Sequence, residues 1–405
     1  MKPGVCRMVG HMGFRAFSSP YDWSRIAGFK KTAASVPGGM ADLSVGSPVD
    51  PVPQSVRSAM IESVDAANAH GYPTTAGTKG LRDAIATWFR NLRGVDLEAI
   101  GAGVVPTVGS KEGVALMASL LHLGEGDVVV QPRVSYPTYE IGTQLAGATV
   151  LKVDDVADVE SWRHVPGVKA VWVNSPSNPS GEVLDADGLS GIVSAARAVG
   201  ATVLSDECYA LMDWREDSSA ETSNEPASEH AYSLSAAPCA LSPLVCGGSA
   251  EGVLVLYSLS KQSNMAGYRT ALIAGDASLL REMAEYRKQI GQIIPGPVQA
   301  AMTAALRDVA AVHEQRERYR RRLTELVKAL RDNGYDAAMP EGALYVWVRA
   351  KSGDCWRDMA VLAELGIVPS PGEFYSAPEY LRFAVTAPDA MIDLAAERLT
   401  AAAGR

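Results

Sequence analysis

Short apolar segments rich in β-branched residues recur along the middle of the chain, and amphipathic segments separate them. Apolar runs of about four to eight residues predict buried strands, whereas apolar residues spaced three and four apart predict helices. This alternation is typical of a mostly parallel sheet covered by helices on both faces, so we expect an α/β fold. The predicted strands are 127–131, 169–174, 201–205, 252–258 and 270–275, and the predicted helices are 111–123, closed by Gly124, 136–146 and 185–199.

The length of 405 residues favours one large and one small domain. We expect residues 46–295 to form the large, ligand-binding α/β domain, and residues 1–45 and 296–405 to form a small α+β domain. One long helix is predicted from Pro297 to about Asn333, and strands at 343–348 and 380–385 and two further helices follow it.

Between Arg215 and Ala250 the composition changes to Ser, Ala, Glu and Pro, with almost no apolar periodicity. Such a stretch predicts a long surface insertion. The insertion either covers an active site or is a loop without a function, and the sequence leaves both interpretations open.

The charge balance is acidic, because 37 Lys and Arg stand against 46 Asp and Glu and give a net charge of −9. This argues against a nucleic-acid partner, so any bound phosphate should be small and held locally. The five cysteines contain no C-x-x-C pair and favour a reducing compartment, and we expect no metal site. The N-terminal segment lacks a continuous apolar core, and no run approaches about 20 apolar residues. We therefore expect a cytoplasmic protein without a membrane span.

Three polar clusters follow predicted strands, at the carboxyl edge where ligands bind in open α/β sheets. Each cluster alone has an ordinary structural explanation: a turn at Asn178, a helix cap at Asp206, an exposed side chain at Lys261. Together they are harder to explain in this way, because Arg269 lies eight residues after Lys261 and shortly after a glycine. The clusters are Asn178 in VWVNSPSNPSG, Asp206 and Tyr209 in TVLSDECY, and Ser258, Ser260 and Lys261 in GVLVLYSLSK.

The clusters match the chemistry of one cofactor. A lysine amine at a strand end can form a Schiff base with pyridoxal 5′-phosphate, and Asp206 can keep the pyridine nitrogen protonated so that the ring withdraws electrons. Asn178 and Tyr209 can donate hydrogen bonds to the phenolic oxygen. The groups that can hold the phosphate are the hydroxyls of Ser258 and Ser260, the guanidinium of Arg269, and the start of the helix at Gly109, Ser110 and Lys111.

These residues resemble the pyridoxal phosphate dependent aminotransferases of fold type I, class I/II. The family pattern is carried by S-x-S-K with a following G-x-R, by N-P-S-G and by D-E-x-Y, and the resemblance covers nearly the whole chain. It includes LSVGSPVDPVP (43–53), GYPTTAGTKGLRDAI (71–85), VGSKEG (108–113), SYPTYE (135–140), PEGALYVW (340–347) and YLRFAVT (380–386).

The resemblance implies roles for four more residues. Tyr136 would stack on the pyridine ring, Tyr72 would reach the phosphate of the neighbouring subunit of a homodimer, and Arg382, helped by the backbone of Gly46, would bind the substrate α-carboxylate. Asn178 would lie beside that carboxylate as well. The implied reaction is a ping-pong transamination, in which glutamate gives its amino group to the cofactor, leaves as 2-oxoglutarate, and the amino group passes to a keto acid. Lys261 would carry the cofactor and move the proton between the substrate α-carbon and the cofactor carbon.

Within this family the segments SLSKQSNMAGYR, SYPTYE and IIPGPVQAAM look most like the N-succinyldiaminopimelate aminotransferases of lysine biosynthesis. That likeness implies N-succinyl-2-amino-6-oxopimelate as the amino acceptor, with the succinyl end read near Arg25 or by Arg287 and Lys288. An aminotransferase for aspartate or an aromatic substrate is the alternative. The insertion at 215–250 is longer than that group leads us to expect, which leaves substrate access in question.

Three other classes fit less well. Ser258-x-x-Lys261 with Lys351-Ser352-Gly353 imitates the nucleophile motifs of penicillin-binding proteins, but no S-x-N element lies between them and Asp206 would have no role. GAGVVP (101–106) has proline at the third glycine position of a dinucleotide-binding loop. A regulator that binds the cofactor without catalysis would carry a DNA-binding segment, and no basic helix-turn-helix precedes the domain.

Overall fold

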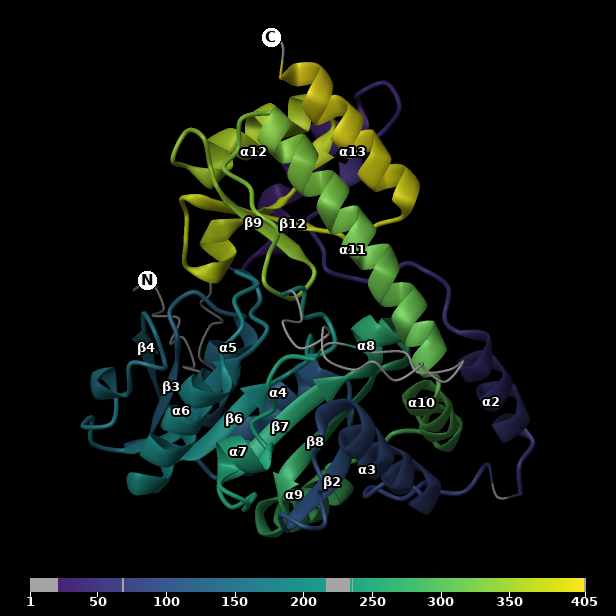
Figure 1. Ribbon diagram of the computed structural model, residues 1–405, viewed down its shortest axis with the longest axis vertical. Helices are drawn as coiled ribbons and strands as arrows, with labels where there is room; N and C mark the ends of the chain where they lie inside the picture. The colour runs from purple at the N-terminus through teal and green to yellow at the C-terminus, as the bar shows by residue number, and fades with distance from the viewer. Residues whose placement is uncertain (1–20, 68, 216–233, 235, 404–405) are drawn as a thin grey trace, which may run out of the picture.

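The computed structural model describes residues 21–403 except 68, 216–233 and 235. A wide sheet with helices around it forms the lower part of the view in Figure 1, a smaller group of helices and strands lies above it, and α11 (Val309–Asp332) runs from one part to the other. None of the helices in the described part of the chain combines the length and the apolar character that crossing a bilayer needs.

The large sheet has seven strands in the order β2-β8-β7-β6-β5-β3-β4. The two pairs that include β8 are antiparallel and the other four neighbouring pairs are parallel, so the expected mostly parallel sheet is confirmed. The strands are β2 (Ala102–Val108), β3 (Val128–Pro132), β4 (Thr149–Val153), β5 (Val168–Asn174), β6 (Thr202–Asp206), β7 (Val253–Ser258) and β8 (Thr270–Asp276).

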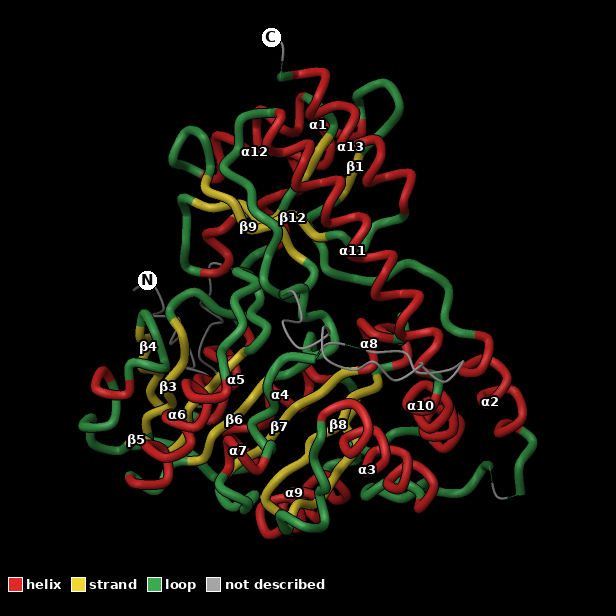
Figure 2. The backbone as a smooth tube through the Cα atoms, viewed as in Figure 1, coloured by secondary structure: helices red, strands yellow, loops and turns green. Residues whose placement is uncertain are grey.

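Both faces of this sheet are buried, as Figure 2 shows by the helices on either side of the strands. Side chains alternate between two cores along each strand: in β7, Val255 and Tyr257 point to one core and Leu254 and Leu256 to the other. Burial on both sides explains why the strands are continuous apolar runs in the sequence. The helices of the first core are α3 (Lys79–Arg93), α6 (Ala186–Ala198) and α10 (Gly296–Arg307), and those of the second are α4 (Ser110–Leu120), α5 (Thr138–Ala146) and α9 (Ala277–Gln289).

A separate core holds the smaller part together. It contains a three-stranded sheet in the order β11-β12-β9 and the parallel pair β1-β10, and the N-terminal helix α1 packs into it. Its elements are α1 (Ala27–Ala34), β1 (Ala41–Asp42), β9 (Tyr345–Arg349), α12 (Cys355–Glu364), β10 (Ile367–Val368), β11 (Ser370–Pro371), β12 (Tyr380–Ala384) and α13 (Asp389–Ala402). The division of the chain into a domain of residues 46–295 and a second domain stays a prediction. Helix α10 follows that boundary, but its buried side chains pack with the large sheet rather than with this core.

Three expectations about local structure are wrong. The helix after β2 ends at Leu120, and His122 rather than Gly124 takes the left-handed conformation behind it, with φ of 57°. The long helix predicted from Pro297 is two helices, because Asp308 leaves helical geometry and its carboxylate accepts a hydrogen bond from Ala311 N at 3.0 Å, which caps α11.

The third error concerns the insertion at 215–250. Residues 216–233 lie outside the described part of the chain, but 236–250 return to the core and include the short helix α7 (Pro243–Cys246). Ala237, Ala240 and Leu241 are buried. This half of the insertion is therefore packed structure, and sequence composition missed it because its apolar residues follow neither a helical nor a strand period.

A buried ion pair holds this returning segment. The carboxylate of Glu207, directly after β6, lies 2.7 Å from Arg93 of α3, and both side chains are 1% exposed. Glu207 also accepts a hydrogen bond from Ala240 N at 2.8 Å, and Arg93 donates one to Ala237 O at 2.9 Å. The pair thus ties α3, the end of β6 and residues 237–240 together.

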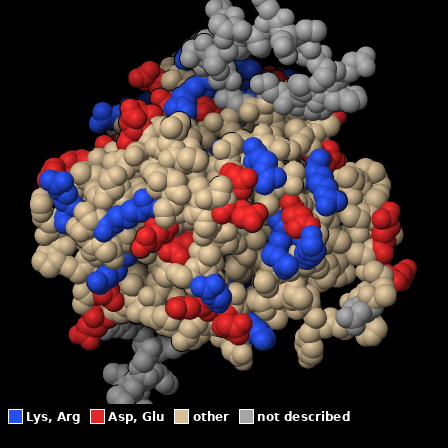
Figure 3. All heavy atoms as spheres, turned by 60° about the horizontal axis from the view of Figure 1, so that its bottom comes forward, with Lys and Arg blue, Asp and Glu red and all other residues tan. Residues whose placement is uncertain are grey.

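Charged side chains of both signs are interspersed over the face of the large part shown in Figure 3, with no extended basic surface on it. Isolated surface pairs of this kind contribute little stability, whereas breaking a buried pair leaves a charge without compensation.

We expect Arg93→Ala to lower the free energy of unfolding by about 3–5 kcal/mol, because Glu207 would stay buried without its cation. The matched control is Arg90→Ala in the same helix, whose pair with Asp96 at 3.2 Å is exposed and should cost less than about 1 kcal/mol. Urea unfolding of both variants measures the difference. Equal losses in the two variants would show that the buried pair does not hold the segment.

Candidate active site

The predicted polar clusters meet because β5, β6 and β7 are parallel neighbours. Asn174, the last residue of β5, pairs in register with Asp206 at the end of β6, and β7 beside it ends at Ser258. The short helix α8 (Leu259–Gln262) starts there and carries Lys261. These ends border a cavity of about 240 Å³ lined by Tyr21, Trp23, Val45, Gly46, Ser47, Ser110, Lys111, Tyr136, Asn174, Asn178, Asp206, Cys208, Tyr209, Ser258, Ser260, Lys261, Ala266, Arg269, Tyr345 and Arg382.

The amine of Lys261 lies inside the cavity and donates a hydrogen bond to the carbonyl oxygen of Gly46. Burial, and to a smaller degree the positive charges of Arg382 and Arg269, lower the pKa of this amine to about 8. A lysine with a pKa close to neutral holds a substantial neutral fraction, and only the neutral amine can attack a carbonyl carbon. The environment therefore prepares Lys261 as a nucleophile and as a base.

Asp206 is a buried acid that lacks a cation. Its carboxylate accepts hydrogen bonds from the hydroxyl of Tyr139 at 2.8 Å and from Cys208 N at 3.2 Å, and no ion pair reaches it from the described residues. Burial raises the pKa of Asp206. A protonated pyridine nitrogen is a cation that would offset this cost, so the residue fits the predicted cofactor.

The candidate phosphate site combines hydroxyls, a cation and a helix start. Ser258 and Ser260 are linked by a hydrogen bond of 2.9 Å between their hydroxyl oxygens. Ser110 is the first residue of α4, whose free amide groups favour an anion. Arg269 has φ of 56° and its guanidinium packs against Gly109, where a Cβ atom would clash with Nη2. Gly109 itself has φ of 79°, a left-handed conformation that favours glycine.

Arg382 of β12 is a buried cation of the cavity wall. It donates hydrogen bonds to Asn178 Oδ1 at 2.8 Å and to Ser44 O at 2.9 Å, and its guanidinium lies 4.1 Å from the centre of the Tyr345 ring. Its Nε is buried and has no hydrogen-bond partner among the described residues. The Tyr345 hydroxyl also shares a hydrogen bond of 2.6 Å with the hydroxyl of Tyr209.

Most of the predicted site residues line this one cavity, with two exceptions. Gly109 lies behind the guanidinium of Arg269. Tyr72 is 100% exposed and does not line the cavity of its own chain.

The residues named for the succinyl end of the substrate do not line the cavity. Arg287 is fully buried in a pair with Glu112 at 2.8 Å, and neither it nor Lys288 lines the cavity, so that assignment is wrong. Arg25 is paired with Glu373 at 2.6 Å, two residues from Trp23 in the cavity wall.

Several residues of the site were not predicted from the sequence. Asn174 could have been found from the sequence, since it ends a predicted strand four residues before Asn178. In the structure its Oδ1 accepts a hydrogen bond from Asn178 N at 2.8 Å. Tyr139 lies in the quoted SYPTYE segment, but only the fold shows that its hydroxyl reaches Asp206. Tyr21, Trp23 and Tyr345 come from the smaller part, and no local signal in the sequence places them here.

Comparison with known proteins points to one family. The family model "Aminotransferase class I and II" matches residues 39–399. The chain is 40% identical over 382 residues to the 4-dedimethylamino-4-oxo-anhydrotetracycline transaminase OxyQ of Streptomyces rimosus, and the match covers 94% of this chain and 98% of that protein. It is 39% identical to the probable aminotransferase Rv1178 of Mycobacterium tuberculosis, over 96% of this chain and 87% of that protein.

A solved structure with a similar fold is the probable N-succinyldiaminopimelate aminotransferase from Thermus thermophilus. The TM-score is 0.78 at 25% sequence identity, and the match covers 94% of this chain and 99% of that one. The family match over most of the chain and the cavity built around Lys261 and Asp206 lead to one conclusion: the chain belongs to the class I and II aminotransferases of fold type I, whose cofactor is pyridoxal phosphate.

Proposed function

We propose that this aminotransferase moves an amino group from glutamate to N-succinyl-2-amino-6-oxopimelate, which yields 2-oxoglutarate and N-succinyl-LL-2,6-diaminopimelate. The observation that carries the proposal is the single cavity in which Lys261, Asp206, Arg269 and Arg382 converge. The choice of acceptor is supported by the likeness to the Thermus structure, which is described as a probable enzyme of that specificity.

In the proposed mechanism the cofactor supplies a carbonyl carbon for the amine and a ring that takes up the electron pair left by the α-proton. The Asp206 carboxylate would hold a proton on the ring nitrogen. Ser258, Ser260 and Arg269 would hold the phosphate, and Tyr136 would cover the ring. The neutral amine of Lys261 would move a proton from the substrate α-carbon to the cofactor carbon in the first half of the reaction, and in the opposite direction in the second half.

Four cationic side chains in the described part of the chain line the cavity, and once Lys261 and Arg269 are assigned to the cofactor, Arg382 and Lys111 remain for a substrate with two carboxylates. We assign Arg382 to the α-carboxylate, because a planar guanidinium can donate two parallel hydrogen bonds and its Nε still lacks a partner among the described residues. Lys111 lines the cavity in the first turn of α4 and forms no ion pair with a described residue, and its amine lies 5.8 Å from the centre of the Tyr21 ring. We assign Lys111 to the cofactor phosphate or to the distal end of a dicarboxylate, since it lines the same cavity as Arg269 and Arg382.

A panel of acceptors tests the proposal. After reaction with glutamate, the protein should transfer the amino group fastest to the succinylated keto acid. Oxaloacetate, aromatic keto acids and a polycyclic ketone of the kind named for OxyQ should each have a kcat/KM at least about tenfold lower. Release of 2-oxoglutarate and consumption of the acceptor are the measurements.

The control for the panel is Lys261→Ala, which should bind the cofactor without the visible absorbance of the wild type and turn over with none of the acceptors. A faster reaction with any other acceptor would overturn the substrate assignment. Turnover by Lys261→Ala near the wild-type rate would overturn the proposed role of the lysine.

Arg382→Lys should slow the reaction with glutamate and the reaction with the keto acid alike, because both substrates present the same carboxylate to the same cation. Lysine cannot reproduce the paired hydrogen bonds, so kcat/KM should fall by about tenfold to several hundredfold in each half-reaction. Single-turnover absorbance measurements follow the two halves separately. A loss confined to one half would instead assign Arg382 to the side chain of that substrate.

We also propose a homodimer in which Tyr72 completes the site of the partner subunit. Tyr72 is fully exposed, and apolar side chains of the loop beside the cavity and of α2 (Gln54–Val64) are partly exposed as well, which favours a covered surface. They are Val45, Val49, Ile61 and Val64.

Sedimentation should therefore give twice the chain mass, and Tyr72→Phe should weaken cofactor binding by about tenfold through the loss of one hydrogen bond to a charged group. The control is Tyr286→Phe, an exposed tyrosine of α9 outside the cavity, which should leave the cofactor affinity unchanged. An active monomer would contradict the dimer, and equal affinities in the two variants would contradict the role of Tyr72.

A further inference from the structure

The loop between β1 and α2 forms part of the cavity wall through its backbone. The carbonyl of Gly46 accepts the hydrogen bond from Lys261, and the carbonyl of Ser44 accepts one from Arg382 Nη2 at 2.9 Å. The loop also packs so closely on Tyr345 that a Cβ atom on Gly46 would clash with its hydroxyl. A small displacement of this loop would therefore disturb both cations at once.

A buried arginine of α11 holds the other end of the same loop. Arg322 is 2% exposed and donates to both carboxylate oxygens of Asp50 at 2.8 Å, four residues after Gly46. Its Nε donates to Asp389 at the start of α13 at 2.6 Å. Paired hydrogen bonds between a guanidinium and a carboxylate fix orientation as well as distance. Asp50 is thereby held in one position relative to α11.

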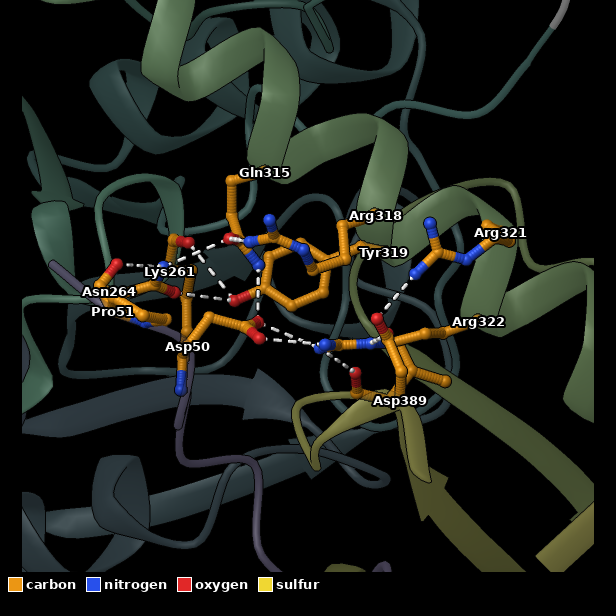
Figure 4. A network of polar contacts seen from close by, with 11 residues as sticks. Asp50, Pro51, Lys261, Asn264, Gln315, Arg318, Tyr319, Arg321, Arg322 and Asp389 are labelled. Carbon is orange, nitrogen blue, oxygen red and sulfur yellow. Dashed lines mark hydrogen bonds and ion pairs between the residues drawn. The ribbon is translucent and has the colours of Figure 1, made fainter. Parts of the chain in front are cut away.

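The loop is tied on its other side to the segment that follows Lys261, as Figure 4 shows. Gln315 of α11 donates from Nε2 to Asp50 at 2.8 Å, and its Oε1 accepts a hydrogen bond from Asn264 at 3.0 Å. Asn264 also donates to Pro51 O at 3.2 Å. The hydroxyl of Tyr319 donates to Asn264 Oδ1 at 3.2 Å. The network thus joins the loop, α11 and the residues behind the catalytic lysine.

We propose that the Asp50–Arg322 pair is a positioning device that fixes the loop of residues 44–50, so that the carbonyls of Ser44 and Gly46 hold Arg382 and Lys261 in place for the substrate carboxylate. The inference rests on the proposed role of Arg382. The pair contacts neither the cavity nor Asp206, Ser258, Ser260 or Arg269, so the groups assigned to the ring and the phosphate stay in place when it is lost. We therefore expect substrate binding to suffer far more than cofactor binding. A displacement of even about 1 Å at a binding group is enough to cost a large factor in binding or rate.

Binding of succinate to the holoenzyme tests this directly, because succinate carries carboxylates but no amino or keto group. Asp50→Asn keeps the size of the side chain and removes its charge, and Arg322→Lys keeps the charge and removes the paired geometry. Each variant should raise the succinate Kd and the KM for glutamate by at least about tenfold. The cofactor Kd, measured by titrating the apoenzyme, should change less than about twofold.

The matched control is Arg321→Gln. Arg321 neighbours Arg322 and pairs with the same Asp389 at 2.7 Å, but it is exposed and does not contact Asp50. Its variant should bind succinate as the wild type does. If Asp50→Asn and Arg322→Lys lower only the unfolding temperature and leave the succinate Kd unchanged, the pair is merely structural and the inference is overturned.

The variant Arg382→Lys separates this inference from the proposed function. If Arg382→Lys weakens succinate binding and the Asp50 and Arg322 variants do not, the positioning role is wrong and the carboxylate site stands. If Arg382→Lys leaves succinate binding unchanged, the carboxylate site itself is wrong and the positioning role falls with it.

Discussion

The parallel register of β5, β6 and β7 is the constraint on which the rest of the site depends. Because the strands are neighbours and run the same way, Asn174, Asp206 and Ser258 end at one edge, and the turn into α8 places Lys261 beside them. The seven-stranded sheet is buried on both faces, so this register cannot shift without turning apolar side chains from one core to the other. The arrangement of the chemical groups is thus a consequence of core packing.

Burial has opposite effects on the two ionisable groups at this edge. It lowers the pKa of the Lys261 amine, which suits a nucleophile, and raises the pKa of the Asp206 carboxyl, which costs stability until a cation arrives. A cofactor with a basic ring nitrogen offsets that cost. The same burial therefore suits the lysine to the proposed role of a nucleophile and the aspartate to the proposed role of a partner for the ring nitrogen.

The second half of the cavity comes from the smaller part of the molecule. Arg382 and Tyr345 lie on neighbouring antiparallel strands, β12 and β9, and Tyr21 and Trp23 come from the N-terminal segment. Their positions depend on the loop of residues 44–53 and on α11, which connect the two parts. The side of the cavity proposed for the substrate therefore depends on packing between the two parts, whereas the side proposed for the cofactor is built from the strand ends of one sheet.

The sequence by itself determined the α/β class, five of the seven strands of the large sheet and the polar residues at the strand ends, because continuous apolar runs and polar strand ends are local signals. The tertiary structure alone decided that Tyr139 bonds Asp206, that Asp50 pairs with Arg322, and that residues 236–250 are buried beside Arg93 and Glu207. It also placed Arg287 in a buried pair with Glu112, away from the cavity. Such pairings join residues that are far apart in the chain. Neither periodicity nor composition indicates which side chains will be in contact in the folded protein.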